Sequence, residues 1–176
     1  MKIHCPSNIP FSREDVFTAY RDDLTSLVQY LPNIEKIEVV KREESGDGIL
    51  EFENHWYAQA QIPKVAQAFI KPEMLKWVDY AKWDQNTWTC DWRIETFFMR
   101  EAVTCGGRNE FSEAGSDAMA LTINGDLSLN AKAVPGVPRL LAGTIKPQLE
   151  KFIISLITPN FETINQGIIS FLNSKG

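Results

Sequence analysis

The chain has 176 residues, of which 44% are hydrophobic and 23% are charged, and its formal net charge is −5. This balance predicts a folded chain with a substantial core, and we expect one domain over residues 1–176. The acidic charge and the lack of a basic stripe argue against a nucleic-acid partner. No apolar run approaches the roughly 20 residues of a membrane span, so we expect no stable membrane insertion.

Cysteine and histidine patterns give no sign of a metal or nucleophile site. The odd number and wide spacing of Cys5, Cys90 and Cys105 predict reduced thiols in a cytoplasmic protein. His4 and His55 have no Cys or carboxylate at a metal-ligand spacing, so we expect no metal. No glycine-rich phosphate loop or nucleophile elbow occurs. We therefore expect no cofactor, and no motif identifies a catalytic residue.

The N-terminal part predicts an edge strand followed by two short helices. Lys2–Pro10 is a short mixed segment that fits an edge strand. Ser12 and Asp15 have the spacing of a capping box, in which each side chain binds the backbone amide of the other residue. A second short helix is expected to begin at Asp22–Asp23 and to end at Pro32.

The middle of the chain predicts strands joined mainly by hairpins. Ile34–Glu44 and Ile49–Ala58 flank the turn sequence Ser45–Gly48 and should pair with each other. Further strands are expected at Met74–Trp83, Thr87–Met99, Ala102–Phe111 and Ala118–Leu129. Gln59–Pro72 interrupts this rhythm, and its apolar residues Val65, Phe69 and Ile70 fit either a docked loop or a lid.

Alternation along two strands collects large side chains on one face of each strand. In Ile49–Ala58 this face holds Leu50, Phe52, Asn54 and Trp56. In Thr87–Met99 it holds Trp88, Cys90, Trp92, Ile94, Thr96 and Phe98. The opposite face of the second strand carries Asp91, Arg93 and Glu95, which fits a solvated charged ladder. Whether the aromatic face lines a cavity or forms a closed core stays open, because a slip of one residue would invert it.

The strongest helical signal spans Pro138–Leu172, where apolar residues recur at steps of three and four. A helix of this length must bury its apolar face, and a curved sheet offers the surface to do so. Pro147 is expected in the first turn, with Thr144 as the cap. Pro159 lacks an amide donor, so we expect a kink or break near Thr158.

Two further segments carry a resemblance to a known family. Ile9–Phe17 resembles the opening strand and helix of the START-like (SRPBCC) superfamily, and Leu31–Val39 resembles its proline-led entry into the next strand. With the C-terminal helix, the resemblance covers essentially the whole chain. It implies the α+β helix-grip fold, in which a curved antiparallel sheet of about six to seven strands wraps around a long C-terminal helix. Two short helices follow the first strand.

The resemblance also implies a function. START-like proteins usually hold a hydrophobic tunnel of ~300–1,000 Å³ between sheet and helix. We expect a non-enzymatic protein that binds or carries a hydrophobic small molecule or lipid, while transient contact with a membrane stays open. The expected ligand-binding residues are Phe52, Trp56, Trp77, Trp88, Trp92, Ile94, Phe98, Leu121, Leu149, Phe152, Ile153 and Leu156.

Two alternatives remain. The first is an enzyme of the polyketide cyclase or dehydratase kind, which needs a general acid–base residue in the cavity. Asp79, His55 and Glu110 are its candidates, and a buried position together with a perturbed pKa for one of them would rank this alternative above the binding role. The second is a closed core with a role in protein interaction, which predicts no internal pocket of useful size.

Overall fold

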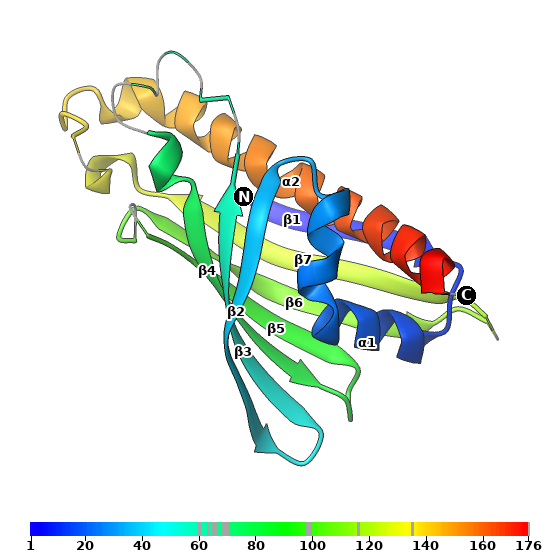
Figure 1. Cartoon of the computed structure of the whole chain (residues 1–176). Coiled ribbons are helices and arrows are strands. Elements are labelled where there is room, and N and C mark those ends of the chain that lie inside the picture. Colours follow the sequence, from blue (N-terminus) through cyan, green and yellow to red (C-terminus); the bar gives the residue numbers. More distant parts are fainter. Residues whose placement is uncertain are drawn as a thin grey trace.

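The computed structural model describes the chain apart from residues 60, 63, 65, 66, 68–70, 98, 99, 116, 135 and 176, and apart from the side chains at 152, 155–160 and 162. The strands that it describes form one antiparallel sheet in the order β1-β7-β6-β5-β4-β3-β2 (Figure 1). The strands are β1 (Lys2–Ile9), β2 (Ile34–Gly46), β3 (Ile49–Ala58), β4 (Lys76–Asp84), β5 (Thr89–Thr96), β6 (Val103–Glu113) and β7 (Met119–Leu129).

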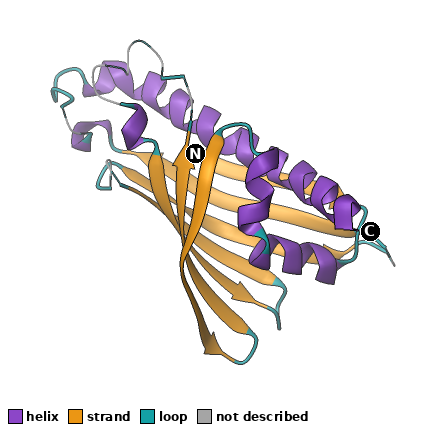
Figure 2. Ribbon diagram, viewed as in Figure 1, coloured by secondary structure: helices purple, strands orange, loops and turns teal. Residues whose placement is uncertain are grey.

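The helices cover one face of this sheet. The long helix α2 (Ala142–Lys175) lies along the concave face, and α1 (Arg13–Asp22) with the 3₁₀ helix η1 (Leu24–Tyr30) lies beside the C-terminal half of α2 (Figures 1 and 2). Two further 3₁₀ turns are η2 (Pro72–Met74) and η3 (Ala131–Ala133). The predicted helix-grip fold is therefore confirmed, including the two short helices after the first strand.

Helix α1 begins as the sequence predicts, with one difference in its cap. The Asp15 amide donates to Ser12 Oγ at 3.1 Å, which is the expected first half of a capping box. The Asp15 carboxylate, however, accepts from Ser12 Oγ at 2.6 Å, so the expected return bond to the Ser12 amide is not made. An aspartate is one methylene shorter than the glutamate of a typical capping box, and its carboxylate reaches the nearer hydroxyl.

No break occurs near Thr158, where the sequence predicts a kink or break. Helix α2 runs from Ala142 to Lys175 as one element, and it begins two residues before the expected cap, Thr144. Buried apolar residues lie on both sides of Pro159, including Ile153 before it and Ile164 after it. Each buried aliphatic side chain contributes about 1.5–3 kcal/mol. Together they outweigh the ~3 kcal/mol that an interior proline costs.

Two glycines in the middle of the sheet make room for a tryptophan. Gly107 of β6 pairs directly with Gly125 of β7 and with Trp92 of β5. A Cβ atom on Gly107 would lie 2.6 Å from the Trp92 ring and 2.0 Å from the Asn124 carbonyl oxygen. A Cβ atom on Gly125 would lie 2.8 Å from the same ring. The indole of Trp92 therefore packs against a stretch of sheet that carries no side chain.

We expect Gly107→Ala to destabilise the fold, because the added methyl group overlaps both the Trp92 ring and the backbone of β7. Overpacking of this kind costs about 1–3 kcal/mol. The change is measured as the free energy of unfolding in urea. The matched control is Gly143→Ala in the first turn of α2, where an added Cβ atom would meet nothing within 4 Å. Equal stability of the two variants would contradict the packing of Trp92 on the glycine pair.

Candidate functional site

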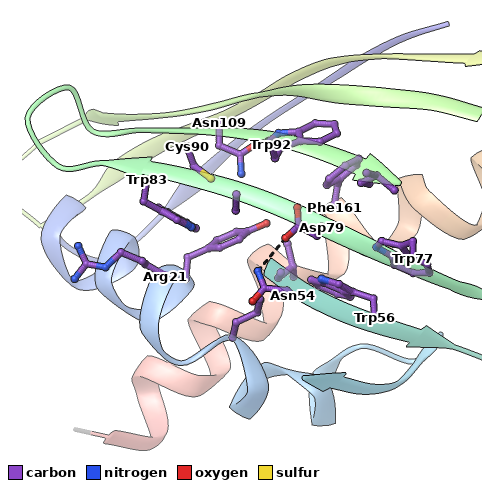
Figure 3. Close-up of a pocket in the computed structure, with 15 residues that line it drawn as sticks. Arg21, Asn54, Trp56, Trp77, Asp79, Trp83, Cys90, Trp92, Asn109 and Phe161 are labelled. Carbon is purple, nitrogen blue, oxygen red and sulfur yellow. Dashed lines mark hydrogen bonds between the residues drawn. The ribbon is translucent and has the colours of Figure 1, made fainter. Parts of the chain in front are cut away.

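A cavity of about 80 Å³ lies between the concave face of the sheet and helix α2 (Figure 3). Its wall comes from α1, η1, strands β3 to β6 and the second half of α2. The lining residues are mainly aromatic or aliphatic: Tyr20, Arg21, Leu24, Asn54, Trp56, Trp77, Asp79, Ala81, Trp83, Cys90, Trp92, Ile94, Asn109, Phe161 and Ile164. The volume is below the ~300–1,000 Å³ expected from the resemblance, because bulky rings fill much of the space.

Four of the expected ligand-binding residues, Trp56, Trp77, Trp92 and Ile94, lie together in this wall. Four others pack in the hydrophobic core without lining the cavity, namely Phe52, Leu121, Leu149 and Ile153. The side chains of Phe98, Phe152 and Leu156 lie outside the described residues, and so do those of the lid candidates Val65, Phe69 and Ile70.

Trp88, also expected in the wall, lies elsewhere. It stands in the turn before β5 with a positive φ of 54°, so the strand alternation does not apply to it. Its ring packs edge-on against Phe17 at 5.2 Å, and the guanidinium of Arg13 lies 4.2 Å from its centroid. Asp84 sets this turn, because its Oδ1 accepts from the amide of Asn86 at 2.9 Å. Placing Trp88 in the cavity is therefore wrong.

The cavity wall contains aromatic pairs supplied by neighbouring elements. Trp56 and Trp77 are directly opposite each other on β3 and β4, and their rings stack at 5.7 Å with an interplanar angle of 14°. Trp92 meets Phe161 of α2 at 5.6 Å. Stacked and edge-on aromatic pairs each stabilise by about 0.5–1.5 kcal/mol beyond their burial. The wall is thus held in place before any ligand arrives.

Two buried asparagines support this wall, and sequence reasoning did not single them out as functional. Asn109 of β6 is 3% exposed, and its Oδ1 accepts from Trp92 Nε1 at 2.8 Å. Asn54 of β3 is 2% exposed and faces Asp79 across the β3–β4 pair. The available signal was a polar residue within an otherwise apolar strand face, since a buried amide needs partners. The same signal does not exist for Phe161 or Ala81, which resemble ordinary core residues.

Asp79 is the acidic residue of the cavity wall (Figure 3). It accepts a hydrogen bond from Asn54 Nδ2 at 3.2 Å. Burial raises the pKa of Asp79 to about 6, while Asn54 and the nearby Trp56 indole lower it in part. Among the described residues, Asn54 Oδ1 has no hydrogen-bond partner, whereas Trp56 Nε1 interacts with Asp79 without meeting the full geometry of a hydrogen bond. The wall of the cavity therefore contains one titratable carboxyl, Asp79, and one buried acceptor without a partner among the described residues, Asn54 Oδ1.

The other two acid–base candidates lie on the outer face of the sheet. His55 Nε2 is 2.9 Å from Glu53 Oε1, and the His55 ring meets Phe97 edge-on. Glu110 is exposed on β6. The charged ladder expected on this face is present, since Arg108 Nη2 donates to Asp91 Oδ2 at 2.7 Å and Arg93 Nη1 donates to Glu95 Oε2 at 2.9 Å.

The buried cysteines are protonated thiols. Burial raises the pKa of Cys90, which lines the cavity, and raises the pKa of Cys105 to about 12. A thiol in this state is a weak nucleophile. In the part of the chain that the structure describes, no group of three or more His, Cys, Asp or Glu residues is placed to hold a metal ion. No described helix is long and apolar enough to cross a membrane.

Comparison with known proteins shows the fold. No family model matches the chain, and no curated protein matches its sequence. Solved structures do match over nearly the whole chain. The chain has the START-like helix-grip fold. A protein from Thermus thermophilus, TTHA0849, has a TM-score of 0.68 and 18% identity, with 97% of this chain and 98% of that chain covered.

Two other structures with this fold have descriptive names. The Zhui aromatase/cyclase from Streptomyces sp. R1128 has a TM-score of 0.66 and 12% identity, with 97% of this chain and 92% of that chain covered. Norcoclaurine synthase from Thalictrum flavum has a TM-score of 0.57 and 17% identity, with 98% and 86% covered. At these identities, the likeness establishes how the chain folds and leaves its ligand open.

The raised pKa of Asp79 gives a testable pH dependence of stability. The folded value is about 6 and the ordinary value is 3.8, so the folded state binds this proton more tightly. The stabilisation by Asp79 is then complete below the ordinary pKa and is lost as pH rises through about 6. Relative to Asp79→Asn, we expect the wild-type free energy of unfolding to fall by up to about 3 kcal/mol between roughly pH 4 and pH 7. Urea denaturation across this range measures it, and a difference that is constant with pH would contradict the burial of Asp79.

Proposed function

We propose that this protein binds a small hydrophobic molecule with an aromatic ring in the cavity between the sheet and α2. The observation that carries the proposal is a preformed aromatic wall around a few polar groups. This composition is typical of small-molecule sites. Apolar burial supplies the affinity, at roughly 25 cal/mol per Å² before the costs of ordering. The hydrogen-bonding groups of Asn54, Trp56 and Asp79 orient the ligand.

The size of the cavity narrows the class of ligand. A volume of about 80 Å³ suits a single-ring compound, or the end of a longer molecule, better than a whole lipid. A cavity that can hold a single ring also favours a binding role over the closed-core alternative, which expects no internal pocket of useful size. The proposal therefore keeps the hydrophobic cargo predicted from the sequence and prefers a small aromatic one.

Native mass spectrometry of the purified protein tests this proposal first, with organic extraction of any bound compound. Single-ring compounds such as phenol, benzyl alcohol and 2-phenylethylamine are then titrated while tryptophan fluorescence is recorded. Four tryptophans of the wall, Trp56, Trp77, Trp83 and Trp92, report on occupancy. No bound compound and no fluorescence change with any of these probes would overturn the proposal.

Filling the cavity should abolish binding. Ala81 is buried on β4 and lines the cavity. The three carbon atoms that Ala81→Leu adds occupy space that the ligand needs, so we expect probe affinity to fall by at least about 10-fold while the fold is retained. The matched control is Lys82→Leu, the next residue of the same strand, which is exposed on the other face. Equal loss in both variants, or no loss in either, would contradict the position of the site.

A second candidate function is acid–base catalysis in the same cavity, and one observation favours it. Asp79 meets part of the condition for an enzyme, because the pKa of its carboxyl is raised to about 6 while the residue is half-buried in the cavity wall. A group with such a pKa exchanges protons near neutral pH. The names of two proteins that share the fold, an aromatase/cyclase and a synthase, are consistent with this candidate. Asp79 would remove a proton from carbon and return one to it.

Deuterium exchange tests this candidate without knowledge of the natural substrate. In D₂O, the Asp79 carboxylate would take a proton from the carbon next to the ketone of 1-phenyl-2-propanone. The resulting enolate would then regain a deuteron from the carboxyl after exchange with solvent. Proton NMR should show exchange faster than in buffer, with a loss of about 10²-fold or more in Asp79→Asn. The matched control, Glu110→Gln on the outer face, should exchange like wild type. Unchanged exchange in Asp79→Asn would exclude Asp79 as the base.

A further inference from the structure

The Asp79 carboxylate lies in the cavity wall without a cation beside it. No Lys, Arg or His of the described residues forms an ion pair with Asp79, although many acidic side chains of the sheet are paired. It accepts a hydrogen bond from the neutral amide of Asn54 at 3.2 Å, and its other neighbour, the Trp56 indole, is neutral too. A carboxylate enclosed in this way is unfavourable unless a positive charge joins it. A ligand bound in the cavity could supply this positive charge.

Arg21 is a basic residue in the cavity wall, but its guanidinium group points away from Asp79 (Figure 3). Arg21 contributes to the wall, but its Nη2 atom is 2.7 Å from Asp22 Oδ2 and its guanidinium lies over the ring of Phe17. Figure 3 shows this guanidinium pointing away from Asp79. The positive charge of Arg21 is therefore engaged by α1 and does not compensate the charge of Asp79.

The aromatic rings of the wall also lack a cation. Basic side chains lie over Trp88, Phe17, Tyr57, Phe52, Tyr80 and Phe171 in the described residues, and none of these rings lines the cavity. Of the rings that do line it, Trp56 and Trp77 stack on each other and Trp92 meets Phe161. A ring face attracts a cation by about 0.5–2 kcal/mol, and tryptophan is the best partner.

The side-chain oxygen of Asn54 adds a hydrogen-bond acceptor to the carboxylate and the aromatic rings of the cavity. Asn54 Oδ1 is buried and has no hydrogen-bond partner among the described residues, and it belongs to the same amide that binds Asp79. An ammonium group has several N–H donors and no acceptor, so it can bind a carboxylate and an amide oxygen together. Trp56 Nε1 is a donor beside the same carboxylate, and its interaction with Asp79 lowers the pKa of that carboxyl.

We propose that the cavity is selective for a small organic cation, an amine that is protonated on nitrogen and carries an aromatic or apolar group. The ammonium group would bind Asp79 and Asn54 Oδ1, and its apolar part would pack among the tryptophans. This inference rests on the proposed function, because it names the class of ligand for the same site. It goes further by assigning the sign of the ligand's charge, which apolar burial alone leaves open.

The other titratable groups around Asp79 do not provide the missing charge. Tyr20 comes from α1 and Cys90 from β5, and burial raises the pKa of each, so both stay neutral at pH 7. Cys105 of β6 is also neutral. When the ammonium group binds, it favours the ionised form of Asp79 and so lowers its pKa. Amine binding should therefore weaken as pH falls through the pKa of Asp79 in the free protein.

The test compares three probes of similar shape and different charge. Isothermal titration calorimetry at about pH 7.5 measures the affinity of 2-phenylethylamine, 2-phenylethanol and phenylacetate. We expect the amine to bind at least about 10-fold more tightly than the alcohol, and phenylacetate to bind more weakly than either. In Asp79→Asn, the amine should lose this advantage, so that the ratio of amine to alcohol affinity falls to about one. Binding of the alcohol also shows that the variant is folded.

The possible outcomes separate the two proposals. If the alcohol binds as tightly as the amine to wild type, or if the amine keeps its advantage in Asp79→Asn, the cation inference is overturned and the proposed function stands. If no probe binds, the proposed function fails and the inference fails with it. A second measurement does not depend on the variant. The ratio of amine to alcohol affinity in wild type should decrease at pH 5, and a constant ratio would also overturn the inference.

Discussion

The structure depends on the burial of the apolar face of α2 against a sheet that curves around it. Seven twisted strands leave a concave face that one helix cannot fill by itself, so large side chains from both layers must occupy the rest. Tryptophans from β3, β4 and β5 do so, and Phe161 of α2 meets them. Gly107 and Gly125 keep the sheet bare beneath Trp92 and so set the depth of the cavity there. The cavity is the space that remains after this packing.

The polar groups of the site are a cost to the fold. Asp79, Asn54 and Asn109 occupy positions on the concave face that apolar residues would fill more favourably, and Asn54 Oδ1 is buried without a partner in the part of the chain that the structure describes. Groups that weaken the core in this way are common at functional sites, because the energy they cost is recovered when a ligand binds. The charged residues on the outer face of the sheet give no comparable indication of a ligand site. There the charged residues pair with each other in water and contribute little.

Several features could be predicted from the sequence because they depend on neighbouring residues. The alternation in Ile49–Ala58 placed Phe52, Asn54 and Trp56 on one face, and the structure shows all three buried. The apolar period of the C-terminal segment identified the long helix. The period alone did not predict that α2 continues through Pro159, because that depends on the packing of the residues before and after this proline. Trp88 was misplaced because the positive φ of a turn residue interrupts the alternation, and no period can detect that.

The sequence by itself determined the order and type of the elements, since amphipathic periods and turn residues act over a few positions. It also determined which side chains share a strand face. Only the tertiary structure decided which face is concave, that Asp79 faces Asn54 across β3 and β4, and that Phe161 closes on Trp92. These contacts join residues far apart in the chain. Burial raises the pKa of Asp79 only after the layers assemble, so the chemical character of the cavity belongs to the folded chain.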